Sequence, residues 1–388
     1  MTKSYFKEGN FSTGYATHEL FPYRGKFHPQ LIKGILNILR IQPGDVVLDP
    51  MCGSGTLNVE ASIIGIDSIG IEKSPFCFLM SKVKYSALTV ESTILLSIQK
   101  DMYINYKTLI SDKKLPADFS YYDGLKPEKA ITLLAFMDAM GYARRCSKSI
   151  DVLFPSVLKR YVGQINAFIQ ARNILNLKIG KTRFQIGDAK NLSLENNSID
   201  AIITSPPYSF AIDYAENDRP QLEYLGYNVD ELRKEMIGLN GKNKKEKLAN
   251  YFDDMNQVLG EMHRVLKPNK YAVIIIGSSD SGLANVVILQ EDLSHSCIIL
   301  EVKRPQKTAG LKQLESSCNA IGAQFGFWFD GQEMLMSHRE ESNLKIPRVP
   351  EVTETLRATL TERWNLGWLE EDKDREIIVR SFFDLNKK

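Results

Sequence analysis

The 388-residue sequence predicts an α/β protein whose main part is a parallel, doubly wound sheet. Up to about residue 277, short apolar runs alternate with longer amphipathic segments. Two of these runs end in loops rich in Gly, Ser and Pro, and strands of such sheets carry ligand sites at their carboxyl ends. We expect residues 96–180 to form a helical insertion and the chain after residue 277 to form a smaller α/β module.

The first elements are expected to form a β-turn-α-β-α unit. Residues 29–40 place their apolar side chains on one helical face, and Gln42-Pro43-Gly44 ends that helix. A buried strand from Val46 to Asp49 leads through a Gly-rich turn into a helix that begins at about Leu57. A second strand, Asp67 to Glu72, leads into another helix, as in the repeating unit of a doubly wound sheet.

The sheet is expected to resume after the helical insertion, with strands at Arg183–Gly187 and Ile199–Thr204. A long helix follows from about Glu246 to Leu266. Its apolar side chains recur at 3.6-residue spacing and are Leu248, Phe252, Met255, Val258, Leu259, Met262 and Val265. A turn at Lys267–Lys270 is expected to lead into a strand at Tyr271–Ile276.

Composition leaves the partner open. The 49 Lys and Arg residues nearly balance the 47 Asp and Glu residues, so any nucleic-acid-binding face must be local. No long apolar run and no signal peptide are present, which predicts a cytoplasmic protein without a membrane partner. The five cysteines are scattered and form no CxxC pair, so we expect reduced thiols and no zinc site.

The first ligand-binding motif is the turn Asp49-Pro50-Met51-Cys52-Gly53-Ser54-Gly55-Thr56. Its glycines let the backbone turn sharply and approach a ligand, and the helix behind them presents free amides. No phosphate-binding lysine follows, so a nucleoside-triphosphate loop is not expected. The second strand ends in Glu72, an acid placed to bind ribose hydroxyls. A purely structural turn is the alternative for this motif taken alone.

The second motif, Ser205-Pro206-Pro207-Tyr208, ends the strand at Thr204. A conjugated amine is a poor nucleophile because its lone pair is delocalised into the ring. The Ser205 hydroxyl and the Pro206 carbonyl can accept its two N–H bonds and localise that lone pair, and the two prolines hold these acceptors rigid. Tyr208 can stack on the ring. The alternative is a Pro-Pro turn that only closes a strand.

Together these residues resemble the amino-methyltransferases of bacterial and archaeal restriction–modification systems, which methylate cytosine N4 or adenine N6. The resemblance covers roughly residues 15–277 and includes the segment His18–Gln30, which precedes the glycine turn in the family. It implies a Rossmann-like methyltransferase fold, S-adenosyl-L-methionine as cofactor and double-stranded DNA as substrate. Subunits of a restriction system are candidate partners.

The resemblance also implies roles for single residues. The cofactor site would be lined by Phe27, Asp49, Gly53, Gly55, Glu72 and Asp188. Ser205 to Tyr208 would be the catalytic tetrapeptide, and Ser in place of the more common Asp favours cytosine N4 over adenine N6. The helical insertion and the loop with Lys242, Lys244, Lys245 and Lys247 are candidates for DNA contact. A solvated loop is the simpler interpretation of those lysines.

Residues 283–352 resemble another family, the N-terminal nuclease domain of type I restriction-enzyme R subunits, which has the PD-(D/E)xK fold. Only Gly277 to Ala284 separates the two parts, too little for the helix that a methyltransferase sheet usually has there. The alternative is that the following strands complete the first sheet as its terminal hairpin. Residues 353–388 are expected to form a C-terminal tail.

The nuclease resemblance implies a degenerate site made of Asn285, Glu301, Lys303 and Gln313. The family has an aspartate where this chain has Asn285, and the neutral amide removes a negative charge from the metal site. We therefore expect no cleavage, and Mg²⁺ as a cofactor only if this module is active. No other metal site is expected.

Two other functions stay open. One is a transfer-RNA guanine-N2 methyltransferase, whose family shares a similar glycine turn and tetrapeptide. Those proteins usually carry an RNA-binding domain ahead of the catalytic one, and only about 16 residues precede the His18 segment here, which counts against this alternative. The other is a catalytically silent DNA-binding fusion, which the missing aspartate at Asn285 would fit.

Overall fold

The computed structural model describes residues 14–23, 26–112, 114–207, 213–277 and five later strands between residues 284 and 345. From Ile276 onward only the backbone of the strands is described. The chain divides into two compact units, Ser12–Tyr271 and Ala272–Lys388 with Met1–Phe11. The predicted sites of methyl transfer and cofactor binding all belong to the first unit.

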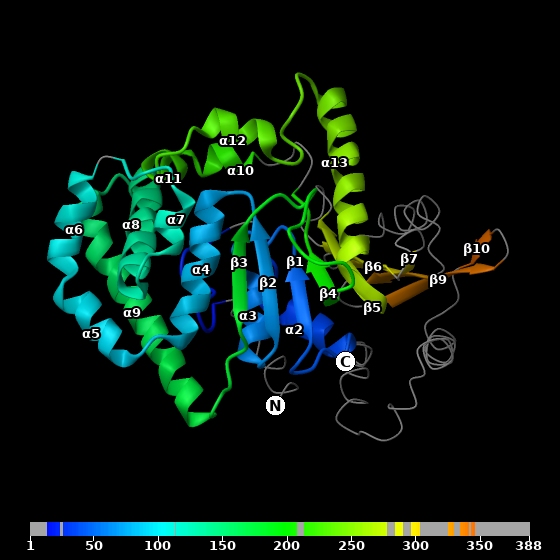
Figure 1. The fold of residues 1–388 in the computed structure, drawn as a ribbon, viewed down its shortest axis with the longest axis horizontal. Helices are drawn as coiled ribbons and strands as arrows, with labels where there is room; N and C mark the ends of the chain where they lie inside the picture. Colours follow the sequence, from blue (N-terminus) through cyan, green and yellow to red (C-terminus); the bar gives the residue numbers. More distant parts are fainter. Residues whose placement is uncertain are drawn as a thin grey trace. The chain divides into compact units, whose positions relative to one another are not determined.

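The first unit contains a parallel sheet with the strand order β4-β1-β2-β3 (Figure 1). The strands are β1 (Val46–Asp49), β2 (Asp67–Glu72), β3 (Thr182–Ile186) and β4 (Ile199–Thr204). Each neighbouring pair is parallel. The strand order reverses between β1 and β4, which is where doubly wound sheets bind ligands. The predicted fold class of this unit is therefore confirmed.

Helices pack against this sheet because its central strands β1 and β4 are largely buried. β4 is buried along its whole length, as expected for a central parallel strand. Helices α2 (Pro29–Ile38), α3 (Thr56–Ile63) and α4 (Pro75–Thr89) pack in sequence on one another, and α3 and α4 contact β2. The Ser74 side chain caps α4 by accepting a 3.4 Å bond from the Cys77 N–H.

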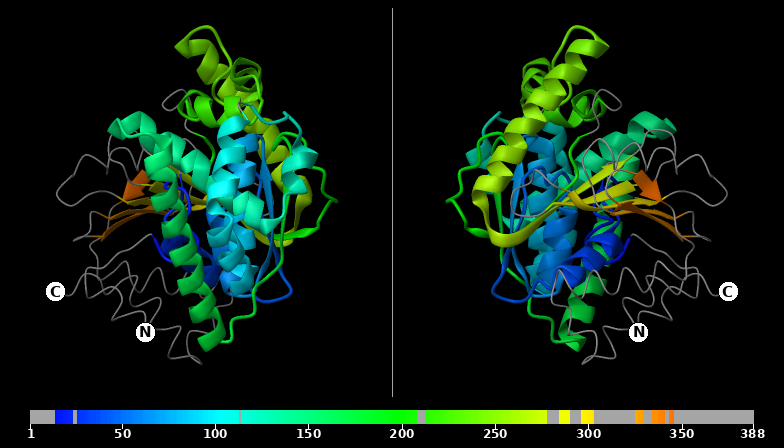
Figure 2. Two further views of the ribbon diagram at one scale, coloured as in Figure 1. Left: turned by 90° about the vertical axis from the view of Figure 1, so that its left-hand side faces the viewer. Right: turned by 90° about the vertical axis from the view of Figure 1, so that its right-hand side faces the viewer.

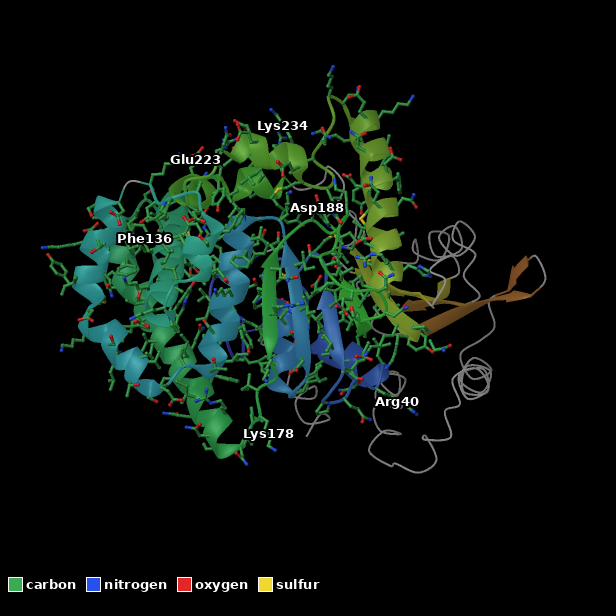
Figure 3. All side chains as sticks on the ribbon, viewed as in Figure 1. Arg40, Phe136, Lys178, Asp188, Glu223 and Lys234 are labelled. Carbon is green, nitrogen blue, oxygen red and sulfur yellow. The ribbon has the colours of Figure 1, made fainter. Side chains whose placement is uncertain are left out.

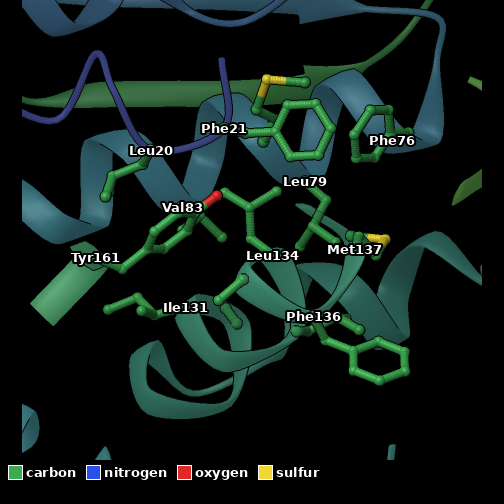
Figure 4. Close-up of a cluster of buried hydrophobic side chains, with 14 of the residues drawn as sticks. Leu20, Phe21, Phe76, Leu79, Val83, Ile131, Leu134, Phe136, Met137 and Tyr161 are labelled. Atoms are coloured by element: carbon green, nitrogen blue, oxygen red, sulfur yellow. The ribbon is translucent and has the colours of Figure 1, made fainter. Parts of the chain in front are cut away.

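The stretch predicted as a helical insertion is helical. It contains α5 (Ser92–Lys100), α6 (Met102–Ser111), α7 (Phe119–Asp123), α8 (Pro127–Cys146) and α9 (Ile150–Ile174). Helices α8 and α9 pack on each other and on α4. Figure 4 shows the resulting core, in which Leu20 and Phe21 of the N-terminal segment meet Phe76 and Leu79 of α4 and Leu134 of α8. The N-terminal segment (residues 14–23) is thereby anchored to the helices.

Four helices follow the tetrapeptide region and lead to the last strand of the unit. They are α10 (Tyr214–Asn217), α11 (Arg219–Tyr224), α12 (Val229–Glu235) and α13 (Lys244–Val265). The α12–α13 connection lies at the top of both side views in Figure 2, at the end to which the β1–β3 arrows point in Figure 1. Of the helices that the structure describes, none has the length and apolarity needed to cross a membrane.

The apolar face predicted for α13 is buried only in part. Met255, Val258, Met262 and Val265 are buried. Leu248 is 37% exposed and Phe252 is 62% exposed, so the apolar face is exposed in the second and third turns. Periodicity fixes the apolar face of a helix but not how far along the helix that face is covered.

The turn predicted at Lys267–Lys270 is instead part of a strand, β5 (Leu266–Gly277). Within this strand Asn269 takes a positive φ of 62°, in the left-handed region, so the backbone departs locally from the extended conformation. The ammonium groups of Lys267 and Lys270 lie 2.8 and 3.3 Å from the Asp200 carboxylate. These contacts with a neighbouring β4 residue hold the stretch extended, and the local sequence does not encode them.

The second unit continues from β5 with the strand order β5-β6-β7-β8-β9-β10. Its strands are β6 (Ala284–Leu289), β7 (Ser296–Val302), β8 (Phe325–Phe329), β9 (Met334–Glu340) and β10 (Asn343–Lys345). All neighbours are antiparallel except β7 and β8. The register pairs Asn285 with Glu301, while Lys303 and Gln313 lie outside the described residues. The nuclease resemblance stays a prediction.

Candidate active site

The two predicted ligand loops leave the same edge of the sheet. β1 and β4 are parallel neighbours with Val47 opposite Ala201 and Leu48 opposite Ile202. At their carboxyl ends the Thr204 hydroxyl donates a 2.8 Å hydrogen bond to Oδ1 of Asp49. The same carboxylate oxygen accepts a 3.1 Å bond from the Met51 N–H. One buried acid therefore joins the start of the glycine turn to the residue before Ser205.

The glycine turn needs its two glycines. Gly53 and Gly55 have φ angles of 51° and 75°, in the left-handed region that favours glycine. A Cβ on Gly55 would lie 2.8 Å from Cβ of Ser81. The Cys52 N–H donates to the Ile71 carbonyl at 3.0 Å, which holds the turn against β2. The chain thus turns tightly and brings backbone amides to the edge of the sheet.

Glu72, the last residue of the neighbouring strand β2, holds the glycine turn by a hydrogen bond. Its Oε2 accepts a 2.7 Å bond from the Gly53 N–H, and its Oε1 accepts a 2.9 Å bond from the Ser74 N–H. Burial raises the pKa of Glu72, and the backbone N–H donors oppose that rise. The acid predicted to bind ribose hydroxyls therefore also holds the glycine turn and the start of α4 in place.

One carboxylate oxygen of Asp49 is available to accept a hydrogen bond from a ligand. The residue is fully buried, and its Oδ2 has no hydrogen-bond partner among the described residues. Burial raises the pKa of Asp49 to about 7, the Thr204 and Met51 donors oppose this, and the charge of Glu72 adds to it. A buried carboxylate oxygen without a partner is costly, so this position favours a cationic or hydrogen-bond-donating ligand.

A third buried acid, Asp218, lies beside this pair and was not predicted. The Tyr23 hydroxyl donates to it at 3.1 Å, and the Cys77 thiol in turn donates to the Tyr23 oxygen at 3.5 Å. Burial raises the pKa of Asp218 to about 7, and the charge of Glu72 contributes. Its partner Tyr23 lies 195 residues away in the sequence, so the local sequence gave no signal of this contact.

The three acids do not form a metal centre. Across the part of the chain that the structure describes, no three His, Cys, Asp or Glu side chains group so that they could hold a metal ion. Asp49 and Asp218 instead share Glu72 as a common electrostatic neighbour. The edge of the sheet above β1 and β2 is therefore strongly acidic, which suits a positively charged organic ligand.

Asp188 follows the third strand and lies at the same end of the sheet. Figure 3 shows it on the side of α12, which carries Lys234, and opposite the end that carries Lys178. Its Oδ1 accepts a 3.0 Å bond from the Lys190 N–H. Its Oδ2 lies 3.8 Å from Nζ of Lys73, the residue after Glu72. Thus Asp188, which follows β3, lies near the lysine that follows β2.

The remaining predicted site residues differ in burial, and one of them lies outside the described residues. Ser205 and Pro206 follow Thr204 directly, and Pro206 is buried while Ser205 and Pro207 are half-buried. Tyr208 lies outside the described residues. Phe27 is half-buried and lies between the N-terminal segment and α2. The structure therefore places the two predicted amine acceptors one and two residues beyond the Thr204–Asp49 bond.

A cavity of about 360 Å³ adjoins the site. It includes Ile71 and Gly187, the chain neighbours of Glu72 and Asp188, and three phenylalanines, Phe78, Phe119 and Phe184. None of the six predicted cofactor residues lines it. The cavity is therefore next to the predicted cofactor position and does not coincide with it.

The N-terminal segment is fixed beside the site by a buried hydrogen bond between His18 and Glu60. Nε2 of His18 lies 2.6 Å from Oε1 of Glu60 on α3, and the Tyr15 hydroxyl donates to the same oxygen at 2.6 Å. Burial lowers the pKa of His18, although Glu60 opposes this. The Lys26 ammonium donates to the His18 carbonyl at 3.3 Å. These bonds set the position of Tyr23 opposite Asp218.

Fold and site together define a Rossmann-like sheet with an acidic, glycine-lined ligand edge at its switch point. Comparison with known proteins agrees with this class. A family model described as RMKL-like, methyltransferase domain, matches residues 19–109. A model of the N6/N4 type described as DNA methylase matches residues 199–318. The second match continues past residue 283 into the segment that resembles a nuclease domain.

Particular relatives are methyltransferases. The chain is 42% identical over 74 residues to Type II methyltransferase M.MjaII of Methanocaldococcus jannaschii, which is 19% of this chain and 14% of that protein. It is 22% identical over 333 residues to Type II methyltransferase M.BsoBI of Geobacillus stearothermophilus, which is 64% of each chain. A tRNA (guanine(10)-N2)-dimethyltransferase of M. jannaschii is 43% identical over 44 residues, 11% of this chain and 12% of that protein. The chain spans less than two thirds of the length of any of these three relatives.

Proposed function

We propose that this protein transfers a methyl group from S-adenosyl-L-methionine to an exocyclic amino group of a DNA base. The observation that carries the proposal is the 2.8 Å bond between Thr204 and Asp49. Because of it, the turn suited to a cofactor and the tetrapeptide suited to an amine begin at adjacent points of one sheet edge. Methyl transfer needs this proximity between the donor and the amine.

The residues present fit the cofactor. S-adenosyl-L-methionine, when bound, supplies an electrophilic methyl group on a positively charged sulfur. The unpartnered Oδ2 of Asp49 can accept a hydrogen bond from its ammonium group, and the acidic surroundings of Glu72 favour its positive charge. Gly53 and Gly55 leave room for a close approach to the backbone. We assign Phe27 and Asp188 to the same binding site.

Ser205 and Pro206 are proposed to hold the target amine. The Ser205 hydroxyl and the Pro206 carbonyl accept its two N–H bonds, which directs the nitrogen lone pair toward the methyl group. Pro206 and Pro207 restrict the backbone, so these acceptors are oriented before the base arrives. Tyr208 stacks on the base. No strong base is required, since the amine proton becomes acidic only as the new N–C bond forms.

The substrate is proposed to be DNA, with cytosine N4 favoured over adenine N6. The DNA methylase model over residues 199–318 and the long match to M.BsoBI support DNA. The serine at position 205 is the reason to favour cytosine. The match to a tRNA dimethyltransferase supports RNA as the second candidate, but it covers only 44 residues. The same matches to Type II methyltransferases support a role in a restriction–modification system.

A methyl-transfer assay tests the proposal. Tritiated S-adenosyl-L-methionine is incubated with the protein and with genomic DNA or total RNA of matched mass. We expect label in DNA only, and sequencing that reports modified bases should then identify N4-methylcytosine. Label in RNA alone would establish the second candidate. No label in either, with DNA binding retained, would establish a silent DNA-binding protein.

Residues 283–352 are proposed as a separate, inactive nuclease-like module followed by the tail 353–388. What supports this is the sequence resemblance, together with the register that sets Asn285 against Glu301 on β6 and β7. The methylase match over part of the same segment supports the alternative, a terminal hairpin of the first sheet. An assay of Mg²⁺-dependent DNA cleavage distinguishes an active nuclease module from both the inactive module and the terminal hairpin.

A further inference from the structure

The segment from Met236 to Phe252, between α12 and the third turn of α13, is fixed at the rim of the candidate active site. At one end, Glu235 lies 2.7 Å from Nζ of Lys73, the residue after Glu72. At the other end, Asp254 lies 2.9 Å from Nζ of Lys190, two residues after Asp188. The segment is therefore tied on both sides to the loops that carry the candidate cofactor acids.

This segment is structured, and it is not a free lysine run. Leu239 is 8% exposed and belongs to the main core cluster. Asn243 caps α13 by accepting a 3.0 Å bond from the Glu246 N–H, and Glu246 in turn accepts a 2.9 Å bond from the Lys242 N–H. Asn250 donates to the Asn240 carbonyl at 3.2 Å. These bonds fix the backbone that carries the lysines of the segment.

The segment concentrates positive charge at the amino end of a long helix. Lys242, Lys244 and Lys245 are exposed, and Lys247 is half-buried. The amino end of α13 adds the positive end of its dipole, a combination that is unfavourable for the helix alone and favourable for an anion outside it. The protein as a whole has a net charge of only +2, so this is a local concentration of charge.

Apolar side chains stand beside these lysines. Leu248 and Phe252 are one turn apart on α13 and are 37% and 62% exposed. Lys245 lies seven residues before Phe252, which places both on the same side of the helix. Basic side chains interleaved with an exposed aromatic ring suit nucleic acid, since lysines contact phosphates while an aromatic or aliphatic side chain contacts bases or sugars.

We propose that residues 242–252 bind the backbone of duplex DNA beside the base that enters the active site. This surface consists of Lys242, Lys244, Lys245, Leu248 and Phe252. The α12–α13 connection and the start of α13, which carry it, lie at the end of the sheet to which the β1–β3 arrows point (Figure 1). The lysines contact phosphates, and Leu248 and Phe252 fill the space that an extruded base leaves or press against the groove. The inference rests on the proposed function, because it takes DNA as the substrate.

The test is the salt dependence of DNA binding by the full chain. The variant Lys242→Ala/Lys244→Ala/Lys245→Ala is compared with the matched control Lys33→Ala/Lys181→Ala/Arg183→Ala, which removes three exposed basic side chains outside the helical insertion. Binding to a fluorescent duplex of about 30 base pairs is measured between 50 and 200 mM salt, with Phe252→Ala as a separate variant. Each phosphate contact adds roughly 0.9 to the log–log slope, so the first variant should lose about 2 to 3 units of slope and the control less than 1.

The outcomes separate this inference from the proposed function. A lower slope in the first variant only, with unchanged cofactor affinity, supports the surface whatever the methyl-transfer assay gives. Phe252→Ala should weaken DNA binding at least threefold without changing the slope. Equal slopes in the two triple variants overturn the inference, even if the unmodified chain methylates DNA. DNA binding that is absent in the unmodified chain also overturns it.

Discussion

The Thr204 hydroxyl donates a 2.8 Å hydrogen bond to the Asp49 carboxylate, joining the ends of two strands that lie 155 residues apart in the sequence. The bond lies at the switch point between β4 and β1. On one side of it the chain enters the glycine turn, and on the other it enters Ser205-Pro206-Pro207. The separation between the candidate cofactor turn and the candidate amine acceptors is therefore set by two paired parallel strands.

Replacing Thr204 by valine should weaken the fold. Valine keeps the shape but leaves Asp49 Oδ1 with only the Met51 N–H as a donor, so the unfolding free energy should fall by about 1 to 3 kcal/mol. Chemical denaturation measures this. The control is Thr204→Ser, which retains the hydroxyl. Equal losses in the two variants would show that the hydrogen bond is not what stabilises this junction.

Cofactor affinity should rise with pH. Asp49 has a pKa of about 7, and a cationic ligand binds its ionised form, so affinity should increase about tenfold between pH 6 and pH 8. Asp49→Asn keeps an acceptor for Thr204 but cannot ionise, and its affinity should be low with little pH dependence. Isothermal titration calorimetry of the protein with S-adenosyl-L-methionine measures both. A steep rise that persists in Asp49→Asn would assign the dependence to another group, with Asp218 the first to examine.

The stability of the ligand-free protein should fall as the pH rises, whereas the cofactor affinity should rise. The pKa of Asp49 lies above its ordinary value of 3.8, so the folded state binds more protons than the unfolded state between about pH 4 and pH 7. The contribution of Asp49 to stability is then greatest at low pH and is lost as the pH rises through 7. Asp49→Asn should gain stability relative to the unmodified protein from pH 5 to pH 8. If the melting temperatures of Asp49→Asn and of the unmodified protein changed with pH in the same way, this expectation would be wrong.

Ser205 and Asp49 should affect different steps. Ser205→Ala removes one acceptor for the amine, and methyl transfer should fall about 100-fold while cofactor affinity stays within twofold. Tyr208→Ala should likewise lower methyl transfer while leaving cofactor affinity nearly unchanged. Asp49→Ala should lose cofactor affinity first. If all three variants lost cofactor binding equally, the assignment of separate roles would be wrong.

The buried pair of His18 and Glu60 should hold the N-terminal segment in place. Glu60→Ala removes the partner of His18 and of the Tyr15 hydroxyl, so the unfolding free energy should drop by about 2 to 3 kcal/mol. Limited proteolysis should then cut near residues 14–23 faster. The double variant with His18→Ala should lose less than the sum of the two single variants. Additive losses would mean that the two side chains act independently.

Mg²⁺ should not make this protein a nuclease. Asn285 replaces the aspartate of the resembled family, so nicking of supercoiled DNA in Mg²⁺ should be weak or absent, and Asn285→Asp should raise it. Agarose gels of the two forms provide the comparison. Robust cleavage by the unmodified chain that disappears in Glu301→Ala would reverse this expectation.

Local sequence determined much of this protein. Alternation of apolar runs and amphipathic segments was enough to predict strands β1 to β4 and the long helix α13, because period and composition are properties of neighbouring residues. The glycine turn and the Ser-Pro-Pro-Tyr loop were found for the same reason, since each lies within a few residues of a strand end. The parallel order of the strands then placed both loops at one edge.

Only the tertiary structure decided how that edge is built. Thr204 reaches Asp49 across 155 residues and Tyr23 reaches Asp218 across 195, and nothing in either local sequence signals such a contact. The same holds for Leu248 and Phe252, which share the helical spacing of the buried residues of α13 and yet are exposed. A pattern states which face of an element is apolar, but what meets that face depends on where distant parts of the chain end. That is a property of packing, and it appears only when the chain is folded.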